Sequence, residues 1–173
     1  MSNSATPDDL SRSVLFVCLG NICRSPLAQG VTEHLARERG VRDRLRIESC
    51  GTGAWHVGNS PDPRTIDVAL RNGVTLNSLA RQFDPRRDFE RFQLILAMDK
   101  RNQRDILAAA GSRADPARVR LFLEFADPAL AEPHGLEVPD PYYGGPEGFD
   151  LMYRLVRSGA EGVLRKLLGE RTT

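Results

Sequence analysis

Short apolar runs are the first pattern along the chain. They have the length of buried strands and are rich in Val, Ile, Leu and Phe. One further stretch alternates apolar with polar residues, which is typical of a strand covered on one face. The expected strands cover residues 14–17, 45–49, 94–97 and 119–122.

Segments with helical spacing separate these runs. In the first segment, Leu27, Val31 and Leu35 recur every four residues, and Gly40 ends the pattern. The expected helices cover residues 26–39, 65–71, 88–92, 100–110 and 149–168. Strands that alternate with helices form parallel sheets covered on both sides. The pattern therefore predicts a three-layer α/β/α fold, with a four-stranded parallel sheet and helices on both faces.

Two further segments lack such periodicity. Residues 125–146 are rich in Pro and Gly, and we expect them to wrap the surface as a long functional loop. The first residues carry acids and lack the apolar core of a secretion signal, so we expect a mobile tail over residues 1–12. No linker or repeat divides the remainder, which predicts a single domain over residues 13–173.

Composition narrows the classes of partner. Hydrophobic residues make up 40% and charged residues 27% of the chain, as in soluble globular proteins. A net charge of +1 and the lack of a long apolar run argue against nucleic acid and membrane partners. Three cysteines without a secretion signal fit the reducing cytoplasm, where we place the protein. Three widely spaced histidines do not make a metal site, so we expect none.

Candidate chemistry concentrates in the loop after the first strand. Cys18 ends the strand, and Gly20 and Asn21 follow it. Arg24 and Pro26 then open the next helix. A loop in this position directs backbone N–H groups and the positive end of a helix at one spot, which makes an anion site. A thiol and a guanidinium beside the same anion indicate a nucleophile that attacks a bound phosphate.

The residues of this loop suit that chemistry. The helix N-terminus, the N–H donors and Arg24 favour the thiolate, which is the attacking form of Cys18. Ser25 offers a hydroxyl donor to the sulfur, and the planar fork of Arg24 binds two phosphate oxygens at once. Gly20 and Asn21 tolerate positive φ best among the amino acids, which suits a loop that needs it.

Three segments together resemble one known family. Residues 17–26, VCLGNICRSP, are similar to the phosphate-binding loop of the low-molecular-weight protein tyrosine phosphatases and carry the full C-x5-R-S signature. Residues 51–58 with 61–64 resemble the family's specificity loop, and residues 140–145, DPYYGG, resemble its acid loop. The resemblance extends from about residue 13 to the end of the chain.

The resemblance implies a role for each matching residue. Cys18 matches the nucleophile, Arg24 the residue that clamps the phosphoryl group, and Asp140 the general acid. It also implies hydrolysis of phosphotyrosine, in a protein or a small aryl phosphate, through a cysteinyl phosphate and without metal or cofactor. We expect a monomer. The positions that match phosphate- or substrate-binding residues are Leu19, Gly20, Asn21, Ile22, Cys23, Ser25, Trp55, Tyr142 and Tyr143.

Three other functions compete with this one. An arsenate reductase on the same scaffold needs resolving cysteines downstream, and none follows Cys50. A protein-arginine phosphatase of the family carries threonine where Ile22 stands, so Ile22 favours an aryl phosphate. A phosphoprotein-binding module needs neither a thiolate nor an acid, although Cys18, Arg24 and Asp140 are all present.

Two positions leave questions open. Many members of the family carry a histidine where Ser78 stands, and that histidine supports the loop asparagine by hydrogen bonding. We expect a serine to do so less strongly. Cys23 is near enough to Cys18 in sequence for a protective disulfide, and it is equally compatible with a small buried side chain in a tight loop.

Overall fold

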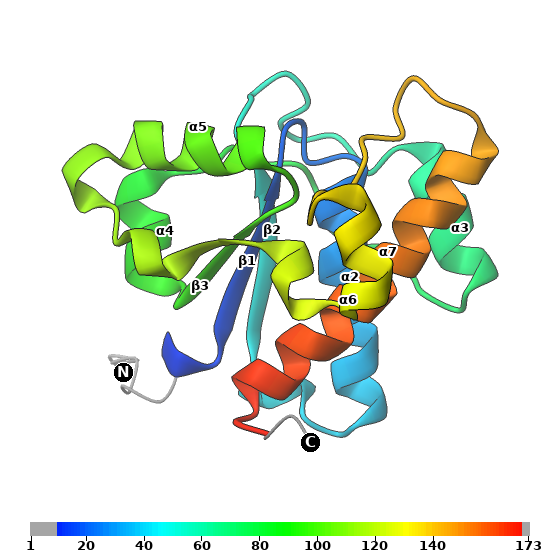
Figure 1. Ribbon diagram of the computed structural model, residues 1–173, viewed down its shortest axis with the longest axis horizontal. Helices are drawn as coiled ribbons and strands as arrows, with labels where there is room; N and C mark the ends of the chain where they lie inside the picture. Colours follow the sequence, from blue (N-terminus) through cyan, green and yellow to red (C-terminus); the bar gives the residue numbers. More distant parts are fainter. Residues whose placement is uncertain (1–9, 171–173) are drawn as a thin grey trace.

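One parallel sheet forms the centre of the protein. The computed structural model describes residues 10–170, so most of the tail predicted over residues 1–12 lies outside the described part. The strands lie in the order β2-β1-β3-β4, and every neighbouring pair is parallel (Figure 1). All the predicted strands are confirmed. Their bounds are Ser13–Cys18 for β1, Arg46–Gly51 for β2, Leu94–Ala97 for β3 and Val119–Leu121 for β4.

Strand β1 is covered on both faces. Val14 and Phe16 belong to one hydrophobic cluster, whereas Leu15 and Val17 belong to a second cluster on the opposite face. All of these side chains are fully buried. Burial on both faces explains why the strand appears in the sequence as a continuous apolar run rather than an alternating one.

Helices cover each face of the sheet, as predicted. The first cluster includes side chains from α2, α3 and α7, and the second includes side chains from α4 and α5. In Figure 1 the two groups lie on opposite sides of the strands. The three-layer α/β/α arrangement is therefore confirmed. The helix bounds are Arg24–Glu38 for α2, Pro63–Arg71 for α3, Pro85–Arg91 for α4, Lys100–Ala110 for α5 and Pro146–Leu167 for α7.

Four helices begin earlier than the sequence pattern indicated, and three of these begin at a proline, whereas α2 begins at Arg24. Helix α3 starts at Pro63, α4 at Pro85 and α7 at Pro146. Proline suits the first turn because its φ is already helical and its missing N–H would have no partner there. In α3 and α4 the preceding aspartate, Asp62 or Asp84, accepts a hydrogen bond from a first-turn amide. These prolines therefore begin the helices instead of belonging to the loops before them.

The prediction of one long loop over residues 125–146 is wrong for its first half. The 3-10 helix η4, Phe122–Phe125, removes Phe122 from the predicted fourth strand. Helix α6, Pro128–Ala131, and the 3-10 helix η5, Glu132–His134, follow it. Asp127 caps α6 in the same Asp-Pro arrangement. Beyond His134 the chain has no helix until α7, so only the second half of this segment is a loop.

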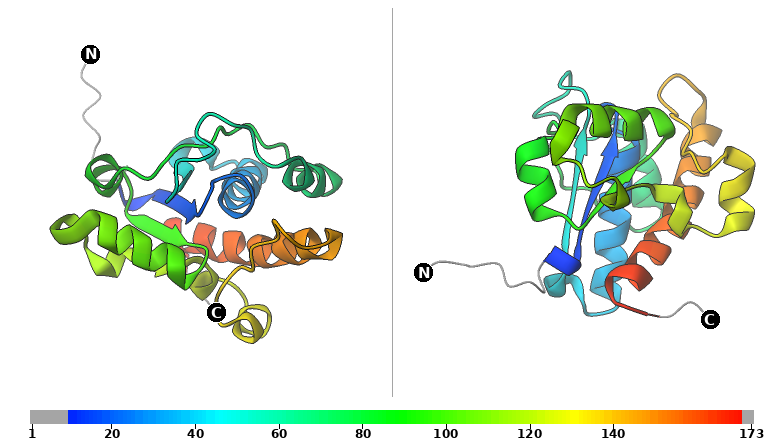
Figure 2. Two further views of the ribbon diagram at one scale, coloured as in Figure 1. Left: turned by 90° about the horizontal axis from the view of Figure 1, so that it is seen from above. Right: turned by 60° about the vertical axis from the view of Figure 1, so that its left-hand side comes forward.

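The loops around the candidate chemistry gather at one end of the molecule. The loops after β1 and β2 and the orange loop before α7 lie at the same end in Figure 1 and in the right view of Figure 2. This is the carboxyl end of the parallel strands, where ligands bind in such sheets. Between residues 10 and 170, no helix has both the length and the hydrophobicity needed to cross a membrane.

Candidate active site

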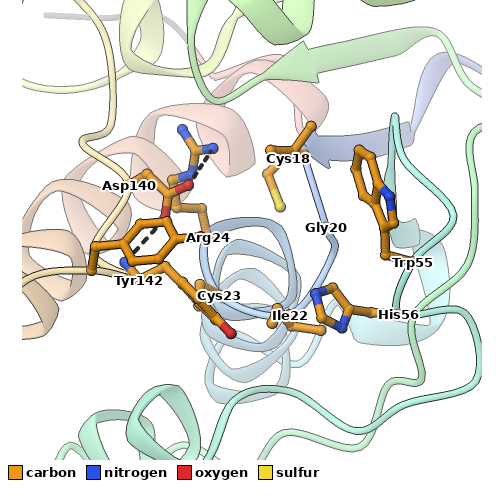
Figure 3. Close-up of a pocket in the computed structure, with 11 residues that line it drawn as sticks. Cys18, Gly20, Ile22, Cys23, Arg24, Trp55, His56, Asp140 and Tyr142 are labelled. Carbon is orange, nitrogen blue, oxygen red and sulfur yellow. Dashed lines mark hydrogen bonds and ion pairs between the residues drawn. The ribbon is translucent and has the colours of Figure 1, made fainter.

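A cavity of about 290 Å³ opens above the carboxyl end of β1. Strand β1 lies between β2 and β3 in the sheet, so the strand order reverses direction beside β1. The crevice at the carboxyl ends of the strands at such a reversal is the usual place for a ligand. Figure 3 shows Cys18 between Trp55 and His56 on one side and Arg24, Asp140 and Tyr142 on the other. The lining residues are Cys18, Leu19, Gly20, Ile22, Cys23, Arg24, Trp55, His56, Asp140, Tyr142 and Tyr143.

The Cys18 sulfur lies at the floor of this cavity, hydrogen-bonded to two groups of its own loop. The side chain is only 3% exposed. The Asn21 amide donates to Sγ over 3.3 Å, and the Ser25 hydroxyl lies 3.0 Å from the same atom. Helix α2 begins directly after Cys23, and no side chain caps its first-turn amides. Donors to sulfur and an uncapped helix N-terminus both stabilise a thiolate and a bound anion.

The Arg24 guanidinium is buried and held by two other segments. Its Nη1 donates to Asp99 Oδ2 over 2.6 Å and to the Val138 carbonyl over 3.0 Å. Its Nη2 lies 3.6 Å from Asp140 Oδ2. Burial lowers the pKa of Arg24, but the negative charges of Cys18, Asp99 and Asp140 outweigh burial and raise the pKa above its ordinary value. Arg24 thus stays charged and links residues 17–26, the phosphate loop, to the segment that carries Asp140.

Asn21 supplies the left-handed residue that shapes the loop. Its φ is 56°, whereas Gly20 is not among the described residues with positive φ. The Asn21 Nδ2 donates to Ser25 over 2.7 Å and to Ser49 over 3.0 Å, and its Oδ1 accepts from the Arg81 amide over 3.0 Å. These bonds stabilise the left-handed backbone conformation of Asn21, which costs free energy for any residue other than glycine.

Gly20 does not supply the positive φ expected of it. A Cβ at this position would lie 3.0 Å from the His56 Cδ2 atom, a tight contact that a small shift of the His56 side chain relieves. Gly51 has a stricter constraint, since a Cβ there would lie 2.7 Å from the Leu19 carbonyl oxygen. The end of β2 therefore presses on the backbone of the phosphate loop.

Ser78 does not support the loop asparagine. The hydrogen bonds described for Asn21 include none with Ser78, which instead lines a separate hollow beside Gln29. The supporting hydroxyl is Ser49, whose Oγ also donates to Gln29 Oε1 over 2.6 Å. Ser49 lies on β2, next to β1, at a position paired with Phe16. Sequence reasoning missed it because an isolated serine in a strand carries no local signal.

Asp140 and the aromatic residues line the mouth of the cavity. The Asp140 side chain is 46% exposed, and its Oδ1 accepts from the Tyr142 amide over 3.1 Å. The rings of Tyr142 and Tyr143 meet edge to face, with 4.9 Å between their centres. Trp55 is largely exposed at the opposite wall. The structure thus brings the predicted acid and all three predicted aromatic residues to one cavity.

The other two cysteines are buried, free thiols. Burial raises the pKa of Cys23 to about 12, with the nearby Asp62 charge adding to the rise and a hydrogen bond with Thr65 opposing it. Burial also raises the pKa of Cys50. Both side chains therefore stay protonated near neutral pH, and a disulfide between Cys18 and Cys23 stays an untested prediction.

Two residues of the site were not identified from the sequence. Asp99 lies just beyond the end of β3, after Met98. It caps α5, since its Oδ1 accepts from the Asn102 amide, and it holds Arg24 through its Oδ2. Its place at the carboxyl end of a predicted strand was an available signal. His56, expected to be a loop residue, lines the cavity. Within residues 10–170, no group of three or more His, Cys, Asp or Glu side chains is placed to hold a metal ion.

Comparison with known sequences identifies close relatives. The family model described as "Low molecular weight phosphotyrosine protein phosphatase" matches residues 13–172. The chain is 49% identical over 157 residues to the low molecular weight phosphotyrosine protein phosphatase of Schizosaccharomyces pombe, and the match covers 89% of this chain and 96% of the relative.

Solved structures agree with the sequence matches. A protein tyrosine phosphatase from Entamoeba histolytica has a TM-score of 0.82 and 31% identity, with 91% of this chain and 97% of that chain covered. The Drosophila arginine phosphatase has a TM-score of 0.78 and 30% identity, with 88% and 95% covered. Since the family model, the relatives and the fold agree over nearly the whole described length, this chain belongs to the low molecular weight phosphotyrosine protein phosphatase family.

Proposed function

We propose that this protein hydrolyses phosphotyrosine, in proteins or in small aryl phosphates, with Cys18 as the nucleophile. The observation that carries this function is the position of the Cys18 sulfur at the floor of the cavity, with Arg24 and Asp140 on one side of it. A buried sulfur with an amide donor and a neighbouring hydroxyl, a fixed guanidinium and an uncapped helix N-terminus together suit a tetrahedral dianion.

In the first step, Cys18 Sγ attacks the phosphorus atom and the bond to the phenolic oxygen breaks. The Nε and Nη2 groups of Arg24, which bond neither Asp99 nor Val138, and the loop amides of residues 19–23 stabilise the charge on the three non-bridging oxygens. Asp140, protonated at this stage, gives its proton to the departing phenolate. The phosphoryl group is then bound to sulfur, and the phenol leaves as the neutral product.

In the second step, water attacks the cysteinyl phosphate. The Asp140 carboxylate accepts a proton from this water, and the bond between phosphorus and sulfur breaks. The Ser25 hydroxyl, 3.0 Å from Sγ, stabilises the thiolate as it leaves. The side chains of Asp99 and Asn21 act indirectly, because they hold Arg24 and the loop backbone in place.

The cavity wall favours an aryl group over a short alkyl group. Trp55, Tyr142 and Tyr143 supply aromatic surface, and Ile22 supplies an apolar one. Activity on phosphotyrosine and phosphoserine peptides, on a phosphoarginine peptide and on arsenate, measured side by side without added metal, tests this selectivity. We expect the phosphotyrosine peptide to be hydrolysed fastest, and a faster phosphoarginine reaction would assign the other activity.

We further propose that the protein works as a monomer in the cytoplasm. The cavity holds Cys18, Arg24 and Asp140 of the same chain, so the proposed mechanism needs no residue from a second copy. All three cysteines are free thiols, which suits a reducing compartment. Sedimentation of the purified protein, with and without substrate analogue, measures the first property.

Substitution of the nucleophile tests the central role. We expect Cys18→Ser to abolish turnover of an aryl phosphate and to leave the circular dichroism spectrum unchanged, since serine keeps the size of the side chain. Rapid quenching of the wild-type reaction is expected to trap a phosphoryl group on Cys18. Turnover by the serine variant at the wild-type rate would exclude Cys18 as the nucleophile.

Substitution of the acid tests the second role. We expect Asp140→Asn to lower kcat on a phosphotyrosine peptide by about 10²–10⁴-fold. The effect on KM should be much smaller, because the asparagine keeps the shape of the side chain. An unchanged kcat would remove Asp140 from the mechanism.

A further inference from the structure

We propose that Arg64 is a positioning residue that holds the acid loop, residues 140–145, over the cavity. This role rests on the proposed function, because it acts through the general acid Asp140. Arg64 lies on the first turn of α3, far from the acid loop in sequence. Its Nη1 donates to the Tyr142 carbonyl over 3.0 Å, two residues beyond Asp140.

The guanidinium also packs on two aromatic rings, one within the acid loop and one on the helix that follows it. The Arg64 Cζ lies 5.4 Å from the centre of the Tyr142 ring and 4.7 Å from the centre of the Phe149 ring. Phe149 lies on the first turn of α7 and is buried. Arg64 thus touches the aromatic wall of the cavity and the helix into which the acid loop leads.

Asp62 fixes the other side of the guanidinium. Arg64 Nε donates to Asp62 Oδ1 over 3.0 Å and Nη2 donates to Oδ2 over 2.9 Å, so the pair is bidentate. Hydrogen bonds from Arg64 hold the pKa of Asp62 below its usual value. The Asp62 side chain is only 9% exposed, and its amide donates to the Ile22 carbonyl over 2.8 Å. Asp62 is therefore anchored to the phosphate loop itself.

These contacts make a continuous connection from the phosphate loop to the acid loop. It runs from the Ile22 carbonyl through Asp62 and Arg64 to the Tyr142 carbonyl. Among the hydrogen bonds described for residues 140–145, the one from Arg64 is the bond that reaches a distant part of the chain. The loop's other hydrogen bonds are local, and the Asp140 ion pair with Arg24 spans 3.6 Å. Loss of Arg64 would thus release the backbone that aims Asp140.

Leaving groups of different basicity distinguish a positioning role from a general stabilising one. A poor leaving group, such as an alkylphenol, needs the proton of Asp140 in the transition state, whereas a nitrophenol leaves largely without it. A displaced acid should therefore slow the first reaction and spare the second. A merely structural loss would slow both reactions equally, because it would disturb the phosphate loop as well.

The experiment compares Arg64→Gln with Arg71→Gln. Arg71 is a matched control on the same helix, since it also links α3 to α7, through Asp150 at 3.2 Å. Its other described bond, to Asp67 at 2.9 Å, stays within α3, and neither bond involves the acid loop. Phosphoenzyme formation is measured in single turnovers on a nitrophenyl and an alkylphenyl phosphate. We expect Arg64→Gln to slow the alkylphenyl reaction by about 10²-fold. The nitrophenyl reaction and the affinity for vanadate should stay close to wild type, and Arg71→Gln should leave both reactions unchanged.

Two further variants make the outcome decisive. In an Asp140→Asn background, Arg64→Gln should cause no additional loss, because residues that act through one group are not additive. Arg64→Lys, which restores one donor, should recover part of the rate, and thermal melting shows whether each variant is folded. Equal losses on both leaving groups, or a full additional loss in the Asp140→Asn background, would overturn the role of Arg64 alone. Absence of any Cys18-dependent turnover in the wild type would overturn the proposed function together with it.

Discussion

At the scale of single residues, Cys18 and Cys23 show how much the surroundings of a thiol matter. Both lie in one loop and both are nearly buried. Cys18 receives an amide donor and lies beside a hydroxyl, and Arg24 adjoins the same cavity. Burial and the Asp62 charge both oppose the ionisation of Cys23. The loop therefore surrounds only one of its two thiols with groups that stabilise a thiolate.

The raised pKa of Cys23 predicts a loss of stability at alkaline pH. The ordinary value is 9.0 and the folded value is about 12, so the unfolded chain releases this proton first as the pH rises. The stabilising contribution of the Cys23 thiol is complete below its ordinary pKa. It falls as the pH rises from that value toward the pKa of the folded protein. We measure the free energy of unfolding by urea at a series of pH values. Above the ordinary pKa of the thiol, this free energy should fall with pH more steeply in wild type than in Cys23→Ala, by up to about 1.4 kcal/mol per pH unit. Parallel curves for the two proteins would contradict it.

At the scale of elements, the end of β2 shapes the loop that follows β1. Gly51 pairs with Cys18 across the two strands, and its Cα faces the Leu19 carbonyl so closely that a methyl group has no room. Backbone atoms do not give way as the end of a flexible side chain does. The geometry of the phosphate loop is thus set partly by a glycine of a neighbouring strand.

We expect Gly51→Ala to displace the phosphate loop and weaken anion binding. Overpacking of this kind costs about 1–3 kcal/mol, which corresponds to roughly tenfold or more in the affinity for vanadate. Cys50→Ala is the matched control, since the neighbouring side chain is buried in the cluster on the opposite face of the sheet. Calorimetric titration with vanadate measures both variants. Wild-type affinity in Gly51→Ala would show that the loop tolerates the methyl group.

At the scale of the whole molecule, the sheet order brings distant segments to one anion site. Arg24 starts α2, Asp99 caps α5 and Val138 precedes the acid loop, yet all of them meet through one guanidinium. The carboxyl ends of adjacent parallel strands lie at one edge, which explains this convergence. An oxyanion bound there binds only the folded chain.

Vanadate should therefore stabilise the whole protein against unfolding. At a concentration 100-fold above its Kd, the expected gain is about 2.7 kcal/mol, seen as a rise in Tm. Arg24→Met should lose this ligand-dependent rise, whereas Arg71→Gln should keep it because Arg71 lies outside the cavity. An equal rise in Tm for Arg24→Met and wild type would place the anion elsewhere.

The sequence by itself determined the strands, the helices and the phosphate loop, because periodicity and turn chemistry act between near neighbours. Cys18, Arg24 and Ser25 were identified in this way, and the left-handed Asn21 was too. The same local reasoning misplaced helix starts at Asp-Pro pairs, where proline has two opposite meanings.

Only the tertiary structure decided which distant residues serve that loop. Local sequence marks none of these residues as part of the site. Ser49 is an ordinary strand serine, Asp99 a helix cap and Arg64 a surface arginine. Each gains its place from strand order and helix packing, which join segments separated by tens of residues in the sequence. A hydrogen bond depends on position in space, and spacing along the chain carries no record of that position until the fold exists.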